Sequence, residues 1–324
     1  MIPPAPSTSP TRGESLRAIT KTSLGSREGP APPSPARGQP NEYPGAAMAE
    51  RRSVRGLVVA VTGAARGIGR ATAARLAAQG ARVAIGDLEA EMAEAAAAEI
   101  GAETIGLPLD VTERRSFEAF VEAVEQRLGP LDVLVNNAGI LLMGPFLEED
   151  DAATQREFAV NVMGVVHGMR IALPRMRERG RGQVVNIASG ASYVAPPGEA
   201  SYAATKHAVV GLTDGVRAEI RDSGVELTLV FPGLVNTELA AGSKPTRGMK
   251  WLDPDTVAEA VVGAIEKPAP EVFVPRSLSA TLKLNKVLPP RARKAMGRLF
   301  RLDQFATAAS AEERAEYNAR IRGS

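Results

Sequence analysis

The sequence contains no cysteine, which excludes disulfides and cysteine-ligated zinc and fits a reducing compartment, so we expect a cytoplasmic protein. Histidine is nearly absent: His167 and His207 stand in no ligand motif, and we expect packing or helix-surface roles for both and no metal site. No apolar run approaches the roughly 20 residues that a membrane span needs. The net charge of +2 gives no general case for a nucleic-acid partner.

The first 50 residues differ from the rest in composition. Ten of the 24 prolines lie before residue 45, mixed with serine, glycine and arginine. Such a segment buries too little apolar surface to offset its ordering entropy, and it lacks the apolar core of a secretory signal. We predict a disordered extension over 1–50, one folded domain over 51–276 and a basic extension over 277–324. Met48 is a candidate for the true start of the chain.

A glycine-rich turn follows the first apolar run. Residues 57–61 are apolar on both faces, as in a central parallel strand, and residues 70–79 have a helical pattern. Between them stand Gly63, Gly67 and Gly69, where the backbone can turn tightly and approach a pyrophosphate at a helix N-terminus. An ordinary glycine-rich turn is the alternative, but the flanking strand and helix favour a nucleotide site. The spacing differs from the commoner G-x-G-x-x-G.

Strand and helix patterns alternate along the rest of the domain. Further strands are predicted at 81–86, 104–109, 131–135, 184–188, 225–231 and 271–274, and further helices at 88–100, 113–128, 152–179, 200–221 and 254–266. Such alternation indicates an α/β fold: a Rossmann-like doubly wound parallel sheet of about seven strands with helices on both faces.

Tyr202 and Lys206 stand four residues apart in a helical pattern, so their side chains share one face. A neighbouring ammonium favours the phenolate, and we expect Lys206 to lower the pKa of Tyr202. Ser189 follows a buried strand and would lie at its carboxyl end. Together the three groups can hold a carbonyl oxygen and protonate it. Tyr193 is the rival tyrosine, but the residue four positions on is Pro197, which supplies no cation.

Asp87 ends the second predicted strand, roughly 20 residues beyond the glycines. An acid there suits the ribose hydroxyls of NAD and repels a 2′-phosphate. Arg66 could instead hold that phosphate, so NADP is the alternative cofactor. Asn161 lies among valines and needs a partner if it is buried.

Residues 234–251 have a mixed, weakly periodic composition and would lie at the carboxyl end of the sheet, where we expect a mobile lid. A mostly apolar pocket wall favours a lipophilic alcohol or ketone as substrate. The predicted wall comprises Ile140, Leu141, Leu142, Val194, Ala195, Pro196, Leu234, Met249 and Trp251.

Residues 275–302 carry eight basic side chains and no acidic one. Apolar residues interleave with them, among them Leu282, Leu299 and Phe300. Such a segment could lie on an anionic membrane surface, or it could cap the pocket or a neighbouring subunit. We favour capping, because apolar residues that can find protein usually do.

These motifs together resemble the short-chain dehydrogenase/reductase family, over residues 54 to about 275. The matching features, in family order, are the turn at 62–69, the run Asn136-Asn137-Ala138-Gly139, Asn161, Ser189, Tyr202 with Lys206, and Pro232-Gly233 with Thr237. The two terminal extensions lie outside the resemblance.

The resemblance implies a role for each residue. Tyr202 would be the general acid and base, Ser189 would hold the substrate oxygen, and Lys206 would lower the tyrosine pKa and bind the nicotinamide ribose. Asn161 would anchor a water that links the lysine to solvent. The implied cofactor-binding set is Gly63, Arg66, Gly67, Ile68, Gly69, Asp87, Asp110, Val111, Asn137, Ala138, Gly139, Tyr202, Lys206, Pro232, Gly233, Val235 and Thr237, with Ile187 lining the nicotinamide.

The function so implied is NAD(P)-dependent interconversion of an alcohol and a ketone. A non-catalytic nucleotide-sensing or scaffold protein on the same fold is the alternative. Epimerases and dehydratases among the extended relatives carry G-x-x-G-x-x-G at the first turn, and this chain does not. Relatives pair through helices equivalent to 152–179 and 200–221, so we expect a homodimer or homotetramer.

Overall fold

The computed structural model describes residues 51–101, 103–243, 250–299, 314, 317–319 and 321. The predicted N-terminal extension, Met48, Met249 and Phe300 lie outside these residues, and so does the side chain of Leu299.

Seven parallel strands form one sheet in the order β3-β2-β1-β4-β5-β6-β7, which confirms the predicted fold class. The five inner strands are almost wholly buried, which explains why each appears in the sequence as a short apolar run, and the two edge strands are partly exposed. Their bounds are β1 Val58–Thr62, β2 Arg82–Asp87, β3 Thr104–Pro108, β4 Val133–Asn136, β5 Gly182–Ile187, β6 Val225–Pro232 and β7 Glu271–Val274.

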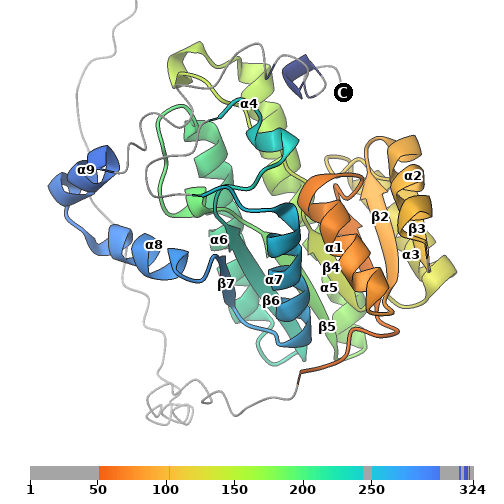
Figure 1. Cartoon of the computed structure of the whole chain (residues 1–324). Helices are drawn as coiled ribbons and strands as arrows, with labels where there is room; N and C mark the ends of the chain where they lie inside the picture. The colour runs from red at the N-terminus through yellow and green to blue at the C-terminus, as the bar shows by residue number, and fades with distance from the viewer. Residues whose placement is uncertain are drawn as a thin grey trace, which may run out of the picture. The chain divides into compact units, whose positions relative to one another are not determined.

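Helices cover both faces of the sheet (Figure 1). Helices α1 (Gly67–Ala78), α2 (Ala90–Ile100) and α7 (Pro254–Glu266) enclose one apolar core with one face. Helices α3 (Arg114–Leu128), α5 (Gly164–Glu178) and α6 (Ala200–Glu219) enclose another with the opposite face. Since β1 is bonded to both β2 and β4, the strand order reverses there, and a crevice opens at the carboxyl ends of these strands.

The predicted helix 152–179 is three elements. Helix α4 (Asp151–Phe158) passes into a π-helical turn, Ala159–Met163, before α5 begins. Asn161 lies in this turn and is fully buried. Helical periodicity does not reveal such a turn, because it adds one residue without ending the helix.

The basic extension begins with two helices, α8 (Leu278–Val287) and α9 (Pro290–Leu299). Helix α8 lies beside β7 at the sheet edge (Figure 1). There Leu282 joins the core, and Lys283 pairs with Glu271 at 2.8 Å. The first part of the basic extension therefore packs on the domain.

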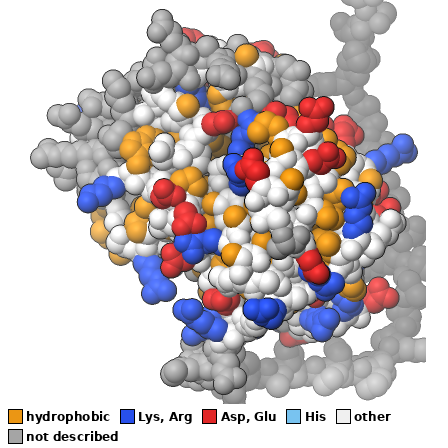
Figure 2. Space-filling model, turned by 45° about the vertical axis from the view of Figure 1, so that its right-hand side comes forward, with side chains coloured by type: hydrophobic (Ala, Val, Ile, Leu, Met, Phe, Trp, Pro, Cys, Tyr) orange, Lys and Arg blue, Asp and Glu red, His pale blue; other side chains and the backbone are white. Residues whose placement is uncertain are grey.

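Acidic, basic and apolar side chains are interspersed on the face shown in Figure 2, and neither charge sign dominates. Ion pairs join acidic and basic side chains on the protein, among them Arg70 with Glu99 and Arg75 with Asp255. In the part of the chain that the structure describes, no helix combines the length and apolar character of a membrane span.

Candidate active site

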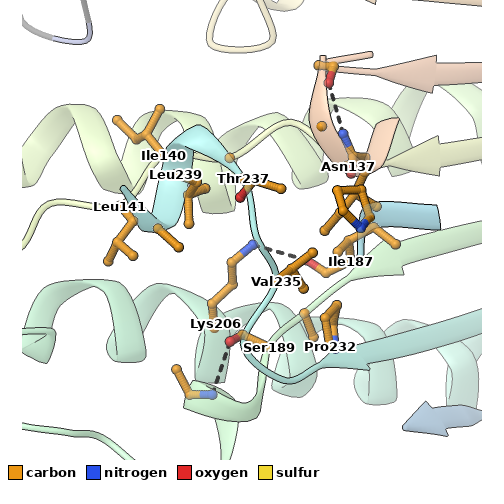
Figure 3. Close-up of a pocket in the computed structure, with 18 of the residues that line it drawn as sticks. Asn137, Ile140, Leu141, Ile187, Ser189, Lys206, Pro232, Val235, Thr237 and Leu239 are labelled. Carbon is orange, nitrogen blue, oxygen red and sulfur yellow. Dashed lines mark hydrogen bonds between the residues drawn. The ribbon is translucent and has the colours of Figure 1, made fainter. Parts of the chain in front are cut away.

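A cavity of about 1450 Å³ runs along the carboxyl ends of the strands. This exceeds the 300–1,000 Å³ typical of small-ligand pockets, so the cavity has room for a dinucleotide and a substrate. In Figure 3, Ile140, Leu141 and Leu239 gather on one side, and Asn137, Ile187 and Pro232 on the other, with Ser189 and Lys206 between them.

Most of the predicted site residues line this one cavity. They are Gly63, Arg66, Gly67, Ile68, Asp87, Asp110, Val111, Asn137, Ala138, Gly139, Ile187, Ser189, Tyr202, Lys206, Pro232, Gly233, Val235 and Thr237. Gly69 and Asn161 do not line it and support it from behind.

The turn after β1 requires glycine for two different reasons. Gly63 has a φ of 62° and Gly67 a φ of 56°, a region that favours glycine. At Gly69 the reason is close packing: a Cβ there would lie 2.6 Å from Asn137 Nδ2 and 2.6 Å from the Gly63 carbonyl oxygen. Gly69 therefore holds α1 against the turn rather than lining the cofactor space.

The N-terminus of α1 opens onto the cavity. Its N-cap, Arg66, makes no side-chain capping bond, so first-turn N–H groups stay available to an anion. The loop after β4 is fixed close by, since Thr62 Oγ1 accepts from the backbone N–H groups of Asn137 and Ala138, both at 3.0 Å. The Asn137 side chain also donates to the Gly63 carbonyl at 3.0 Å. This cradle fits the pyrophosphate of a dinucleotide.

The carboxylate of Asp87 faces the same cradle. One oxygen accepts from the Ala65 N–H at 3.0 Å, which fixes the side chain at the end of β2. Arg66 is held by two carboxylates, Glu89 at 2.8 Å and Glu238 at 3.2 Å, so its charge is already balanced. The adenosine end of the cavity therefore favours hydroxyl groups over a 2′-phosphate.

Asp110 lies at the end of the next strand along the cavity. One of its oxygens accepts from the Thr112 N–H at 2.9 Å and from the Thr112 hydroxyl at 2.7 Å. The carboxylate thus rigidifies the loop that brings Val111 to the cavity wall.

Ser189, Tyr202 and Lys206 converge as their spacing predicts. Ser189 and Tyr202 line the cavity together, and Ser189 Oγ accepts from the Ala191 N–H at 3.1 Å. Lys206 Nζ donates to the Ile187 carbonyl at 3.0 Å and lies 5.7 Å from the Tyr202 ring centre. The three groups therefore meet at the carboxyl end of β5.

The net lowering of the Tyr202 pKa that we expected is wrong for this structure. Burial raises the pKa of Tyr202 above its usual value, while the neighbouring Ser189 hydroxyl acts in the opposite direction. Burial also lowers the pKa of Lys206 to about 8, against the effect of Glu157, which raises it. Desolvation of both groups outweighs the attraction that the spacing suggested.

Asn161 is buried and fully engaged. Its Oδ1 accepts from the Ile140 N–H at 2.8 Å, and its Nδ2 donates to the Ile140 carbonyl at 2.8 Å and to Thr205 Oγ1 at 3.1 Å. The side chain thus ties the π-helical turn to the loop after β4. This supplies the partner that a buried asparagine requires.

The predicted apolar wall is confirmed in part. Ile140, Leu141, Val194, Pro196 and Leu234 line the cavity, as do Leu278 and Leu282 of α8. Three described residues of the predicted wall do not line it. Leu142 turns its N–H to Glu157, Ala195 is exposed, and Trp251 lies between the cavity-lining Lys250 and Leu252. In the predicted lid, Val235 pairs with Leu252 in a parallel bridge, and residues 244–249 lie outside the described chain.

Sequence reasoning missed four residues beside Tyr202: Glu157, Glu199, Arg314 and Tyr317. All four are buried. The Tyr317 hydroxyl accepts from the Leu141 N–H at 2.9 Å and lines the cavity. The position of Glu199, three residues before Tyr202, was a signal that could have identified it. Nothing in the sequence around Arg314 indicates that this residue is buried.

The position of Tyr193, and not its spacing to Pro197, excludes it as the rival of Tyr202. It does not belong to the cavity wall among the described residues, and its hydroxyl donates to Glu271 at 3.0 Å. Lys286 lies 4.7 Å from its ring centre, so a cation is present after all. Tyr193 instead fastens α8 to the sheet edge.

Comparison with known proteins points to one family. The family model described as short chain dehydrogenase matches residues 57–248. The probable oxidoreductase EphD of Mycobacterium tuberculosis is 36% identical over 259 residues, which cover 73% of this chain and 44% of that protein. This chain thus spans less than half the length of that relative. An uncharacterized oxidoreductase, MW2403 of Staphylococcus aureus, is 32% identical over 65% of this chain and 92% of its own length.

Two solved structures share the fold. A short chain dehydrogenase/reductase from Burkholderia phymatum, in complex with NAD, has a TM-score of 0.67 and 29% identity, covering 72% of this chain and 94% of that one. A 3-ketoacyl-(acyl-carrier-protein) reductase from Brucella melitensis, complexed with NADH, has a TM-score of 0.63 and 29% identity, covering 68% and 98%.

Proposed function

The chain belongs to the short-chain dehydrogenase family of oxidoreductases, and on this premise we propose that it interconverts a secondary alcohol and a ketone with NAD. The observation that carries the proposal is the convergence of Ser189, Tyr202 and Lys206 on the wall of the cavity that also contains the nucleotide cradle. Bound NAD supplies the hydride acceptor, and NADH the hydride donor.

The chain's own residues handle the oxygen and the proton. In the reducing direction, the hydroxyls of Ser189 and Tyr202 donate to the carbonyl oxygen, where negative charge develops. Tyr202 then gives up its proton and the product alcohol leaves. In the oxidising direction, Tyr202 takes the proton from the alcohol. Lys206, whose pKa is lowered to about 8 by burial, supplies a positive charge that offsets the tyrosinate.

The adenosine end supports NAD over NADP. Asp87 presents a carboxylate there, and the pairing of Arg66 with Glu89 and Glu238 leaves it little capacity to offset a phosphate dianion. The solved relatives, which hold NAD and NADH, agree with this preference.

The substrate end supports a lipophilic alcohol or ketone. Leu141, Val194 and Leu239 line it, with Tyr317 and Ile321 from the C-terminal segment. Helix α8 adds Leu278 and Leu282 to the cavity wall, which supports capping by this part of the basic extension. An apolar substrate gains about 25 cal/mol for each Å² of apolar surface it buries there.

The test is nicotinamide absorbance with a panel of secondary alcohols and ketones of increasing chain length, run with NAD(H) and NADP(H). We expect turnover with NAD and a rising kcat/KM as the apolar part lengthens. A protein that binds NADH but turns over no alcohol or ketone in the panel would support the scaffold alternative instead.

A further inference from the structure

Three charged side chains from three separate segments lie buried together next to Tyr202. Glu157 comes from α4, Glu199 is the N-cap residue of α6, and Arg314 comes from the C-terminal segment. Their exposed fractions are 0%, 4% and 2%. We call these three residues the acid cluster. Buried charges are rare unless they are paired, so this arrangement needs an explanation.

The two carboxyl groups lack a full set of partners. Glu157 Oε1 accepts from the Leu142 N–H at 2.9 Å, but Glu157 Oε2 and Glu199 Oε1 have no hydrogen-bond partner. Both atoms are closed off from solvent. A buried acceptor without a donor costs about 1–3 kcal/mol, and a carboxyl group avoids part of that cost by keeping its proton.

Arg314 cannot neutralise both acids. Its guanidinium donates to the carbonyls of Leu141 at 2.7 Å, Ala241 at 2.9 Å and Leu239 at 3.2 Å. It therefore fixes the C-terminal segment to two cavity loops and offers the acids one positive charge at longer range. One cation facing two carboxyl groups favours a state in which one of them is protonated.

The titration of the acids follows from this geometry. Burial raises the pKa of Glu157 to about 7 and that of Glu199 to about 7. In both cases Arg314 acts in the opposite direction, and the Glu157 carboxylate raises the pKa of Glu199. Lys206 also lowers the pKa of Glu157, whereas Glu149 raises it. The acid cluster thus gains negative charge within the neutral pH range.

Tyr202 is close enough to respond. Glu199, the N-cap residue of α6, precedes it by three residues, and both residues line the same cavity. The groups that act on the Tyr202 phenol are the Ser189 hydroxyl, both acids and the Tyr317 phenol, and Lys206 lies over the ring. Each carboxylate raises the pKa of Tyr202, with Glu199 the stronger of the two.

We propose that the acid cluster sets the pH range of catalysis by controlling the charge beside Tyr202. Glu157 and Glu199 are positioning residues in this account, because they act through Tyr202 and not on the substrate. The proposal rests on the proposed function, in which Tyr202 exchanges the proton. Since Arg314 lies beyond the region matched to the family, this control depends on the chain's own C-terminal segment.

The test is the pH profile of kcat/KM for alcohol oxidation with NAD, whose rising limb reports the ionisation of Tyr202. We expect Glu199→Gln to move this limb to lower pH by about one unit, and Glu157→Gln to move it less in the same direction. Glutamine keeps an acceptor for the Leu142 N–H, so Glu157→Gln is expected to fold. Glu219→Gln, an exposed change at the far end of α6, serves as the matched control.

Arg314 acts through the two acids, because its charge lowers the pKa of both. Arg314→Met should therefore leave the acids protonated to higher pH and move the limb to lower pH, and Arg314→Lys should restore most of the wild-type profile. A structural defect alone would not be reversed by a lysine that restores only the charge.

The proposal is overturned if both glutamine variants, folded by melting temperature, keep the rising limb where the control has it. If one variant fails to fold, the other decides. Failure of the proposed function would look different: Tyr202→Phe would retain wild-type turnover, and the limb would belong to another group.

Discussion

Replacing Glu157 by glutamine should change how the stability of the protein depends on pH. The folded state raises the pKa of this carboxyl from 4.5 to about 7, mainly through burial. The folded protein therefore holds the proton more tightly than the unfolded chain does. Its contribution to stability is fully present below pH 4.5 and is lost as the pH rises through 7.

The size of the effect follows from the shift. About 2.5 pH units at 1.36 kcal/mol each give about 3 kcal/mol, which the wild type should lose relative to Glu157→Gln as the pH rises above 7. The acid is fully buried, so solvent screening does not reduce this figure much. A loss of that size is a large part of the usual stability of a domain.

Urea unfolding from pH 5 to pH 8.5 measures this loss of stability. The quantity of interest is the unfolding free energy of the wild type minus that of Glu157→Gln, because other titrating groups cancel in the difference. Glu148→Gln, an exposed acid before the same helix, is the control and should give a flat difference. A difference between wild type and Glu157→Gln that stays flat or rises with pH would refute the reasoning.

Three further predictions concern the cofactor and the assembly. Gly63→Ala should weaken NADH binding at least about tenfold, measured by fluorescence titration. The new Cβ would lie 2.7 Å from Ala138 Cα, and the φ of Gly63 is positive, so an unchanged affinity would contradict the tight turn. Asp87→Asn keeps an acceptor for the Ala65 N–H but removes the negative charge. The ratio of kcat/KM with NADP to kcat/KM with NAD should then rise about tenfold, and an unchanged ratio would mean that Asp87 does not set the cofactor preference. Light scattering at micromolar concentration should give a dimer or tetramer through α5 and α6, where partly exposed Val166 leaves apolar surface to cover, and a monomer would contradict it.

The strands were predictable because the central strands of a parallel sheet are buried on both faces. The runs at 57–61 and 225–231 contain little besides apolar residues, and the structure moves their ends by one residue. The convergence of Ser189 and Tyr202 was predictable because strand ends and helix faces have fixed geometry.

Charge was harder to predict than position. An isolated glutamate such as Glu157 is normally exposed, so nothing local distinguishes it from Glu148. Arg314 lies 112 positions after Tyr202, and only the folded chain brings it to Glu199. The direction of the Tyr202 pKa shift was mispredicted for the same reason, since helix spacing reveals a neighbouring lysine but not the depth of burial.

The central claim is that Tyr202 exchanges the proton during hydride transfer, and comparison of two Tyr→Phe variants tests it most directly. Tyr202→Phe should lower kcat for alcohol oxidation at least about a thousandfold while leaving NADH affinity near that of the wild type. Tyr193→Phe, which removes the hydroxyl that bonds Glu271 outside the cavity, should keep turnover close to the wild type. Turnover of Tyr202→Phe within about tenfold of the wild type would contradict the account.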